Sequence, residues 1–184
     1  QSAGRALFQA VGVAVPAGLA AGVVLTLLES FFRPRLPQAL REMEQDVKPW
    51  QAVLASFYGG ISEEIFLRLF AMSGLAWLLA RVWHTPQGMP TDGAIWTANL
   101  LAALLFGIGH LPATRAIAPL TRVVVVRGLL LNGLGALLFG YLYWRFGLLA
   151  AMLAHFTLDL VVHVFWPIWN ASSGQALAGG GKAA

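Results

Sequence analysis

Glu63, Glu64 and Arg68 are ionisable residues that lie close together in an otherwise apolar stretch of the sequence. On a helix, Glu64 and Arg68 are four residues apart with the acid on the N-terminal side, which is the favourable order for an ion pair. The spacing therefore predicts that Arg68 neutralises Glu64, or that Arg68 crosses to another buried acid. Glu63 is left on an adjacent face of the helix without a guaranteed counter-charge.

A second set of ionisable residues lies in two later apolar stretches. His155, Asp159 and His163 occupy successive i,i+4 positions, so they give one helix a polar face. His110 ends the other stretch. Ionisable side chains within a bilayer cost at least about 2.5–3.5 kcal/mol each on insertion scales, so they pair with one another or serve a site. One pair or one histidine can be structural, but the whole set on three apolar helices predicts a functional site, with His163 outside its chemistry.

The composition indicates that a membrane surrounds these residues. Of 184 residues, 58% are hydrophobic and only 11% are charged, whereas soluble domains carry roughly 25% charged residues. The chain has no cysteine, which excludes disulfides and thiolate chemistry. The net charge is +4, but the basic residues are scattered between apolar runs, so we expect no nucleic-acid partner.

The hydropathy pattern predicts an all-α, polytopic transmembrane helix bundle of about five spans, because a helical span needs about 20 apolar residues. The predicted spans are Ala6–Phe32, Trp50–Ala80, Ala94–His110, Gly128–Trp144 and Leu148–Ile168. Gly18 and Gly22 form a small-xxx-small face that is expected to pack against another helix. We expect residues 1–168 to form a single membrane domain and residues 169–184 to be a mobile tail rich in glycine and alanine.

The distribution of basic residues predicts the orientation in the membrane, because cytoplasmic loops retain lysine and arginine. One end of the predicted bundle collects Arg33, Arg35, Arg41, Lys48, Arg115, Arg122, Arg127 and Lys182. The other end has Arg5, Arg81 and Arg145. The first end is therefore expected to face the cytoplasm. The compact chain favours an integral protein of a bacterial inner membrane, with membrane lipid as a partner.

Short motifs on three of these spans carry a family resemblance. The segment 62–68, Ser-Glu-Glu-Ile-Phe-Leu-Arg, resembles the EExxxR motif of the CPBP family, which comprises the CAAX prenyl proteases and bacteriocin-processing (Abi) intramembrane endopeptidases. The segment 106–110 is similar to the family's FxxxH motif, and the segment 155–159 to its HxxxN or HxxxD motif. Each motif alone is weak, but three in the right order on separate apolar helices are specific. The resemblance covers roughly residues 55–168.

The resemblance implies a conical polar cavity open to the cytoplasm and hydrolysis of a peptide bond by a glutamate-activated water. Glu63 would be the general base, and His110 would hold and activate the water. His155 and Asp159 would stabilise the oxyanion. The residues expected to support the site are Glu64, Arg68 and Phe106. We expect no cofactor and no metal, and the partner would be a peptide or protein substrate.

Asp159 departs from the asparagine of many family members. An ionised carboxylate beside a developing oxyanion would repel it, whereas stabilisation needs a hydrogen-bond donor there. Two explanations stay open: Asp159 is protonated in its low-dielectric site, or it orients His155 by accepting the other ring proton.

Two other classes of function stay open as well. The chain can be a non-catalytic membrane protein of the same fold, such as an immunity factor or a small subunit of a larger membrane complex, because fold does not fix function. It can also be a metalloenzyme that uses Glu63, His110 and His155 as ligands, although the sequence has no HExxH or ExxH spacing.

Overall fold

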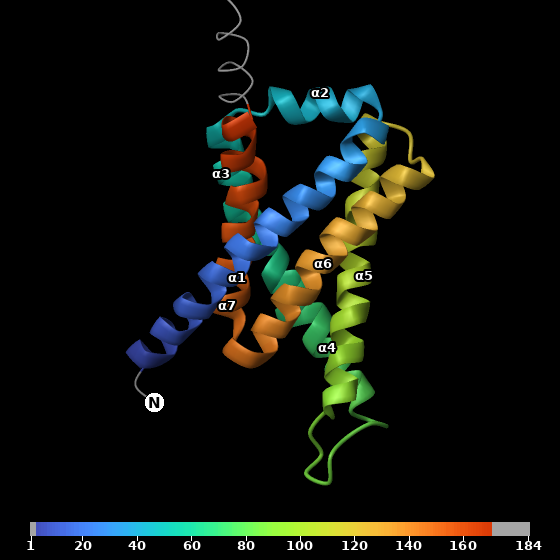
Figure 1. The fold of residues 1–184 in the computed structure, drawn as a ribbon. Helices are drawn as coiled ribbons and strands as arrows, with labels where there is room; N and C mark the ends of the chain where they lie inside the picture. The colour runs from blue at the N-terminus through green and yellow to red at the C-terminus, as the bar shows by residue number, and fades with distance from the viewer. Residues whose placement is uncertain (1–2, 171–184) are drawn as a thin grey trace, which may run out of the picture.

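The computed structural model describes residues 3–170, and it is a helix bundle with no β-strand in that range (Figure 1). Its α-helices are α1 (Ala3–Phe32), α2 (Gln38–Asp46), α3 (Pro49–Tyr58), α4 (Ser73–Leu79), α5 (Asp92–Ile117), α6 (Arg122–Phe146) and α7 (Leu148–Asp159). The π-helical segments are η2 (Gly59–Glu63), η3 (Ile65–Met72) and η4 (Leu160–Phe165), and the short 3₁₀ turn η1 is Arg33–Arg35. The predicted all-α transmembrane bundle is therefore confirmed.

Within residues 3–170, four helices are long and apolar enough to cross a membrane: Leu7–Arg35, Asp92–Ile117, Arg122–Phe146 and Leu148–Asn170. The remaining predicted span, Trp50–Ala80, is the helical run from α3 through η2 and η3 to α4. This run reaches from the end of the bundle where α2 lies, beside α7, to the opposite end beside α5 (Figure 1). The count of about five spans is thus roughly as predicted.

Side-chain caps and one glycine decide where the central helices begin and end. Thr91 and Thr121 cap α5 and α6 by accepting hydrogen bonds from the backbone N–H groups of Ala94 and Val124. Gly147, with φ of +87°, ends α6 and allows the immediate turn into α7, because this backbone conformation carries no steric cost for glycine. This turn brings the helix carrying His155 back through the bundle.

Small residues let α1 pack closely on the run of α7 and η4, and the spacing of Gly18 and Gly22 predicts such packing against another helix. A Cβ atom on Gly18 would lie 2.5 Å from the carbonyl oxygen of Ala154, and one on Gly22 would lie 2.6 Å from the Cβ atom of Val161. Such contacts are impossible for a real side chain without movement, so the predicted packing face is confirmed. The first span therefore packs directly against the helix that carries the last motif, residues 155–159.

Residues 171–184 of the predicted tail lie outside the described residues. Trp169 and Asn170, with which the predicted tail begins, continue the last helix.

Candidate active site

Glu64 is the buried centre of the polar cluster. Its side chain is 0% exposed, and its Oε2 atom accepts a hydrogen bond of 2.9 Å from Nε of Arg68. The predicted Glu64–Arg68 pair is confirmed. The other carboxylate oxygen, Oε1, lies 2.9 Å from Nδ1 of His155 on α7. Because a carboxylate accepts hydrogen bonds, Nδ1 of His155 carries the proton of this bond.

The bond to Glu64 fixes the His155 ring and turns its Nε2 atom toward two further acids. Nε2 lies 3.8 Å from Oε2 of Glu63 and 3.7 Å from Oδ2 of Asp159. The ring stacks on Phe139 of α6 at a centroid distance of 4.4 Å. His155 is only 5% exposed, so its orientation is set by the stacking on Phe139 and by the contacts at its two nitrogens.

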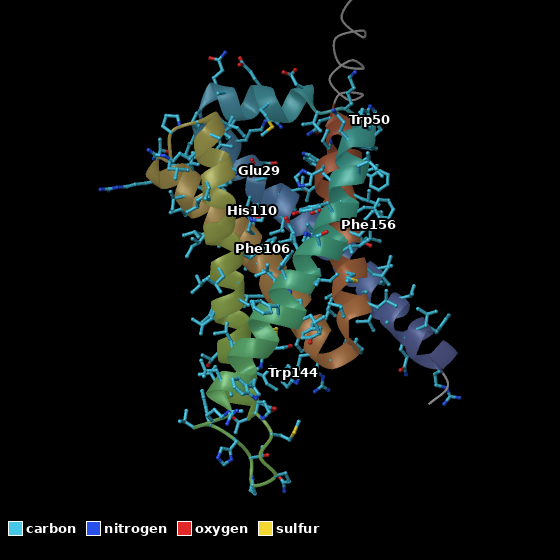
Figure 2. All side chains as sticks on the ribbon, turned by 180° about the vertical axis from the view of Figure 1, so that it is seen from behind. Glu29, Trp50, Phe106, His110, Trp144 and Phe156 are labelled. Carbon is cyan, nitrogen blue, oxygen red and sulfur yellow. The ribbon has the colours of Figure 1, made fainter. Side chains whose placement is uncertain are left out.

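His110 approaches Glu63 from α5. Its Nδ1 atom lies 2.9 Å from the carbonyl oxygen of Phe106, which can only accept, so Nδ1 donates and Nε2 is the free nitrogen of the neutral ring. Nε2 lies 3.9 Å from Oε1 of Glu63. The Phe106 ring packs edge-on against both histidines, 4.5 Å from His110 and 5.9 Å from His155. Figure 2 shows Phe106 and His110 on α5, with His110 in the half of the bundle nearer α2.

The structure therefore brings together the residues that the three motifs contribute. Glu63 lies between the histidines of α5 and α7, and Asp159 adjoins the same nitrogen of His155 as Glu63 does. His163, one turn beyond Asp159, is exposed at the surface of η4. The residues expected to support the site, Glu64, Arg68 and Phe106, all adjoin the cluster.

The side chains of the two adjacent glutamates, Glu63 and Glu64, differ in solvent exposure. The Glu63 and His110 side chains are 25% and 38% exposed, whereas those of Glu64 and Arg68 are fully buried. One side of the cluster is thus accessible from outside the bundle, and the other side is closed. The conical cavity open to the cytoplasm stays a prediction, because the two hollows that the structure describes are lined by other residues.

Gly59 is a feature of the site that the motifs do not reveal. A Cβ atom on Gly59 would lie 3.0 Å from Oδ2 of Asp159 and 3.2 Å from Nε2 of His155. On Gly60 it would lie 3.1 Å from the carbonyl oxygen of Met152. The two glycines let η2 approach α7 closely enough for the acids of one helix to reach the histidine of the other. The signal in the sequence is a glycine pair inside an apolar helix, where glycine is otherwise unfavourable.

The π-helical winding of η2 and η3 was also not predicted. Ser73 holds the end of η3, because its hydroxyl donates to the carbonyl oxygen of Arg68 at 3.0 Å and shares a hydrogen bond of 2.8 Å with the Tyr143 hydroxyl of α6. Turns of π-helix inside α-helices are rare and occur frequently at functional sites.

The donor atoms of the cluster do not form a metal site. Among residues 3–170, no group of three or more His, Cys, Asp or Glu side chains is arranged so that it could hold a metal ion.

Residues 45–161, more than half of the chain, match the family described as type II CAAX prenyl endopeptidase Rce1-like. The chain belongs to this family. The matched region contains all three motifs and confirms the resemblance to the CPBP family, of which the CAAX prenyl endopeptidases are part. Together with the apolar helices, membership of this family makes the chain an integral membrane protein. No curated protein and no solved structure matches the chain.

Proposed function

We propose that this member of the Rce1-like family is an intramembrane endopeptidase that hydrolyses a peptide bond with water activated by Glu63. The observation that carries the proposal is the position of the Glu63 carboxylate between Nε2 of His110, at 3.9 Å, and Nε2 of His155, at 3.8 Å. Glu64 is engaged by Arg68 and His155, so Glu63 is the glutamate with capacity to accept a proton.

The reaction follows from these positions. A water molecule held by Glu63 and by the free nitrogen of His110 gives its proton to Glu63, while its oxygen attacks the carbonyl carbon of the scissile bond. The oxyanion that forms accepts a hydrogen bond from the Nε2–H group of a doubly protonated His155, whose Nδ1–H group keeps donating to Glu64. When the tetrahedral intermediate collapses, the leaving nitrogen takes the proton back from Glu63, so that acid and amine are the products.

The position of Asp159 bears on the two roles left open by the sequence. The Nδ1–H group of His155 donates its hydrogen bond to Glu64, and Asp159 faces Nε2 instead. Asp159 is therefore not the acceptor of the hydrogen bond that Nδ1 of His155 donates. We propose that Asp159 is neutral during turnover and donates to the oxyanion together with His155.

The substrate we propose is a membrane-proximal segment of a peptide or protein, cleaved at the cytoplasmic face of a bacterial inner membrane. The support is that His110 lies in the half of the bundle nearer α2, the end that carries most of the basic residues (Figure 2). No cofactor is needed for this chemistry.

The test compares Glu63→Gln with Glu42→Gln, which removes an exposed acid on α2 far from the cluster. The purified chain in neutral detergent is incubated with internally quenched peptides, with and without a prenylated cysteine, in water enriched in ¹⁸O. We expect cleavage that places one ¹⁸O atom in the new carboxyl group. Glu63→Gln should lower the rate at least about 100-fold, and Glu42→Gln should leave it unchanged.

Two results would overturn the proposal. Full activity in Glu63→Gln would remove the base from the mechanism. Failure of the folded wild-type chain to cleave any of the peptides would favour a non-catalytic protein of this fold, such as a subunit of a larger membrane complex.

A further inference from the structure

A hollow of about 360 Å³ lies at the end of the bundle that carries α2, away from the polar cluster. It is lined by Ser30, Arg33, Pro34, Arg41, Trp166 and Asn170. These residues come from the end of α1, from η1 and α2, and from the last helix. All of them lie outside residues 45–161, so the hollow is a feature of this chain that the family match does not cover.

Two arginines give the hollow a strong positive charge. Arg33 and Arg41 are half-buried, and neither forms an ion pair with a side chain that the structure describes. Arg35, by contrast, donates to the carbonyl oxygen of Phe31 at 2.8 Å and stacks over its ring. Two guanidinium groups that converge on one hollow are suited to the oxygens of a phosphate, which they bind in a bidentate manner.

The arginines are held in place by apolar packing beneath them. Leu36 and Leu40, which are 4% and 3% exposed, are buried against Ala118 and Val124 at the same end of the bundle. This contact fixes η1 and α2 across the helix ends, and Figure 1 shows α2 lying across the bundle. The hollow is therefore shaped before any ligand binds.

Aromatic side chains place the hollow at the depth of lipid headgroups. Trp166 lines the hollow. Trp50 and Trp169, which are 60% and 68% exposed, lie at the same end of the bundle. Figure 2 shows Trp50 near that end. Tryptophan is enriched at membrane–water interfaces because its ring is amphipathic. The last turns of α1, which supply Ser30 to the hollow, also carry the apolar side chains of Leu27 and Phe31, which are 60% and 64% exposed.

We propose that the hollow binds the phosphate of an anionic phospholipid. Arg33 and Arg41 contact the phosphate oxygens, and the amide of Asn170 contributes a further donor. The acyl chains lie along the exposed apolar side chains of α1. This apolar surface favours a lipid over free phosphate, which would gain nothing from it. The proposal does not depend on peptidase activity.

The experiment measures binding of dioctanoyl phosphatidylglycerol to the full chain in neutral detergent by native mass spectrometry. A basic residue near an anionic headgroup contributes about 1 kcal/mol, so the double variant Arg33→Gln/Arg41→Gln should weaken binding about 30-fold. The matched control is Arg115→Gln/Arg122→Gln, which removes the same charge from exposed positions at the α5–α6 connection. Its dissociation constant should stay within about 2-fold of the wild-type value, since these arginines do not line the hollow.

Further measurements separate the hollow from general charge and lipid from phosphate. The single variants Arg33→Gln and Arg41→Gln should each weaken binding about 5-fold, so the test survives a folding failure of the double variant. Dioctanoyl phosphatidylcholine, whose headgroup is neutral overall, should bind more weakly than phosphatidylglycerol. Equal losses in the test and control variants would overturn the proposal. So would displacement of the lipid by inorganic phosphate at equal concentration, because the hollow would then be a simple anion site.

Discussion

Arg68 is expected to contribute strongly to folding, because it is the counter-charge of a carboxylate that has no access to solvent. The perturbation is Arg68→Met, which keeps an unbranched side chain and removes the charge. Breaking a buried ion pair by removing one partner costs about 3–5 kcal/mol, since the other charge stays buried and uncompensated. Glu64 and Arg68 are both 0% exposed, so the full penalty applies here.

Two features of the structure move the expected value toward the lower end of this range. Glu64 keeps its hydrogen bond from His155 when Arg68 is removed. In addition, Nη1 and Nη2 of Arg68 are buried without a hydrogen-bond partner among the described residues, and methionine avoids the cost of burying these two donors, which offsets part of the penalty. We therefore expect Arg68→Met to lower the free energy of unfolding by about 3 kcal/mol. This shifts the folding equilibrium by more than about 100-fold.

The assay is reversible unfolding in mixed micelles with increasing SDS, followed by far-UV circular dichroism. The control Arg115→Met removes an exposed arginine and should change the free energy of unfolding by less than about 0.5 kcal/mol. The double variant Glu64→Gln/Arg68→Met should recover at least about half of the loss, because no lone charge is then buried. Unfolding of Arg68→Met at the wild-type SDS concentration would refute the reasoning.

Two further substitutions probe the cluster through peptide hydrolysis. Gly59→Ala places a methyl group 3.0–3.2 Å from Asp159 and His155, and the resulting shift of these side chains should lower the rate of hydrolysis about 10-fold. The control Gly109→Ala, whose methyl group meets no atom within 4 Å, should leave the rate unchanged. Equal effects of the two substitutions would contradict the role of Gly59. Asp159→Asn keeps the size of the side chain and supplies a donor, so the rate should be retained or raised. Loss of cleavage in that variant would show that an ionised carboxylate is needed at the position.

The existence of the spans could be predicted from hydropathy, but their limits could not. The stretch 111–127, which separates two of the predicted spans, contains the last turns of α5 and the first turns of α6, because the apolar pattern weakens there while the helices continue. The start of α6 is decided by the cap at Thr121, a local hydrogen bond that a count of apolar residues does not register. Helix α2 lies wholly between the first two predicted spans, Ala6–Phe32 and Trp50–Ala80, where the hydropathy pattern predicts no span.

Spacing predicted the contacts of the cluster that lie within one helix, and packing determined the rest. Glu64 and Arg68 are four residues apart, so their pairing follows from helix geometry. Glu64 and His155 are 91 residues apart, and their bond depends on how η2 approaches α7. That approach depends on Gly59 and Gly60, whose role becomes visible only when the neighbouring helix is in place.

The structure gives two adjacent residues of the same type different environments. On a regular helix, neighbouring side chains point about 100° apart, yet Glu63 and Glu64 both face the His155 ring, one at each nitrogen. Glu64 lies between the π-helical segments η2 and η3, whose wider turns change the register of the helix on either side of it. The buried Glu64 is committed to two hydrogen bonds, and the partly exposed Glu63 makes only longer contacts. The environment, and not the residue type, therefore distinguishes Glu64, a structural acid, from Glu63, the potential base. Other enzymes also give two carboxylates of one site different roles in this way.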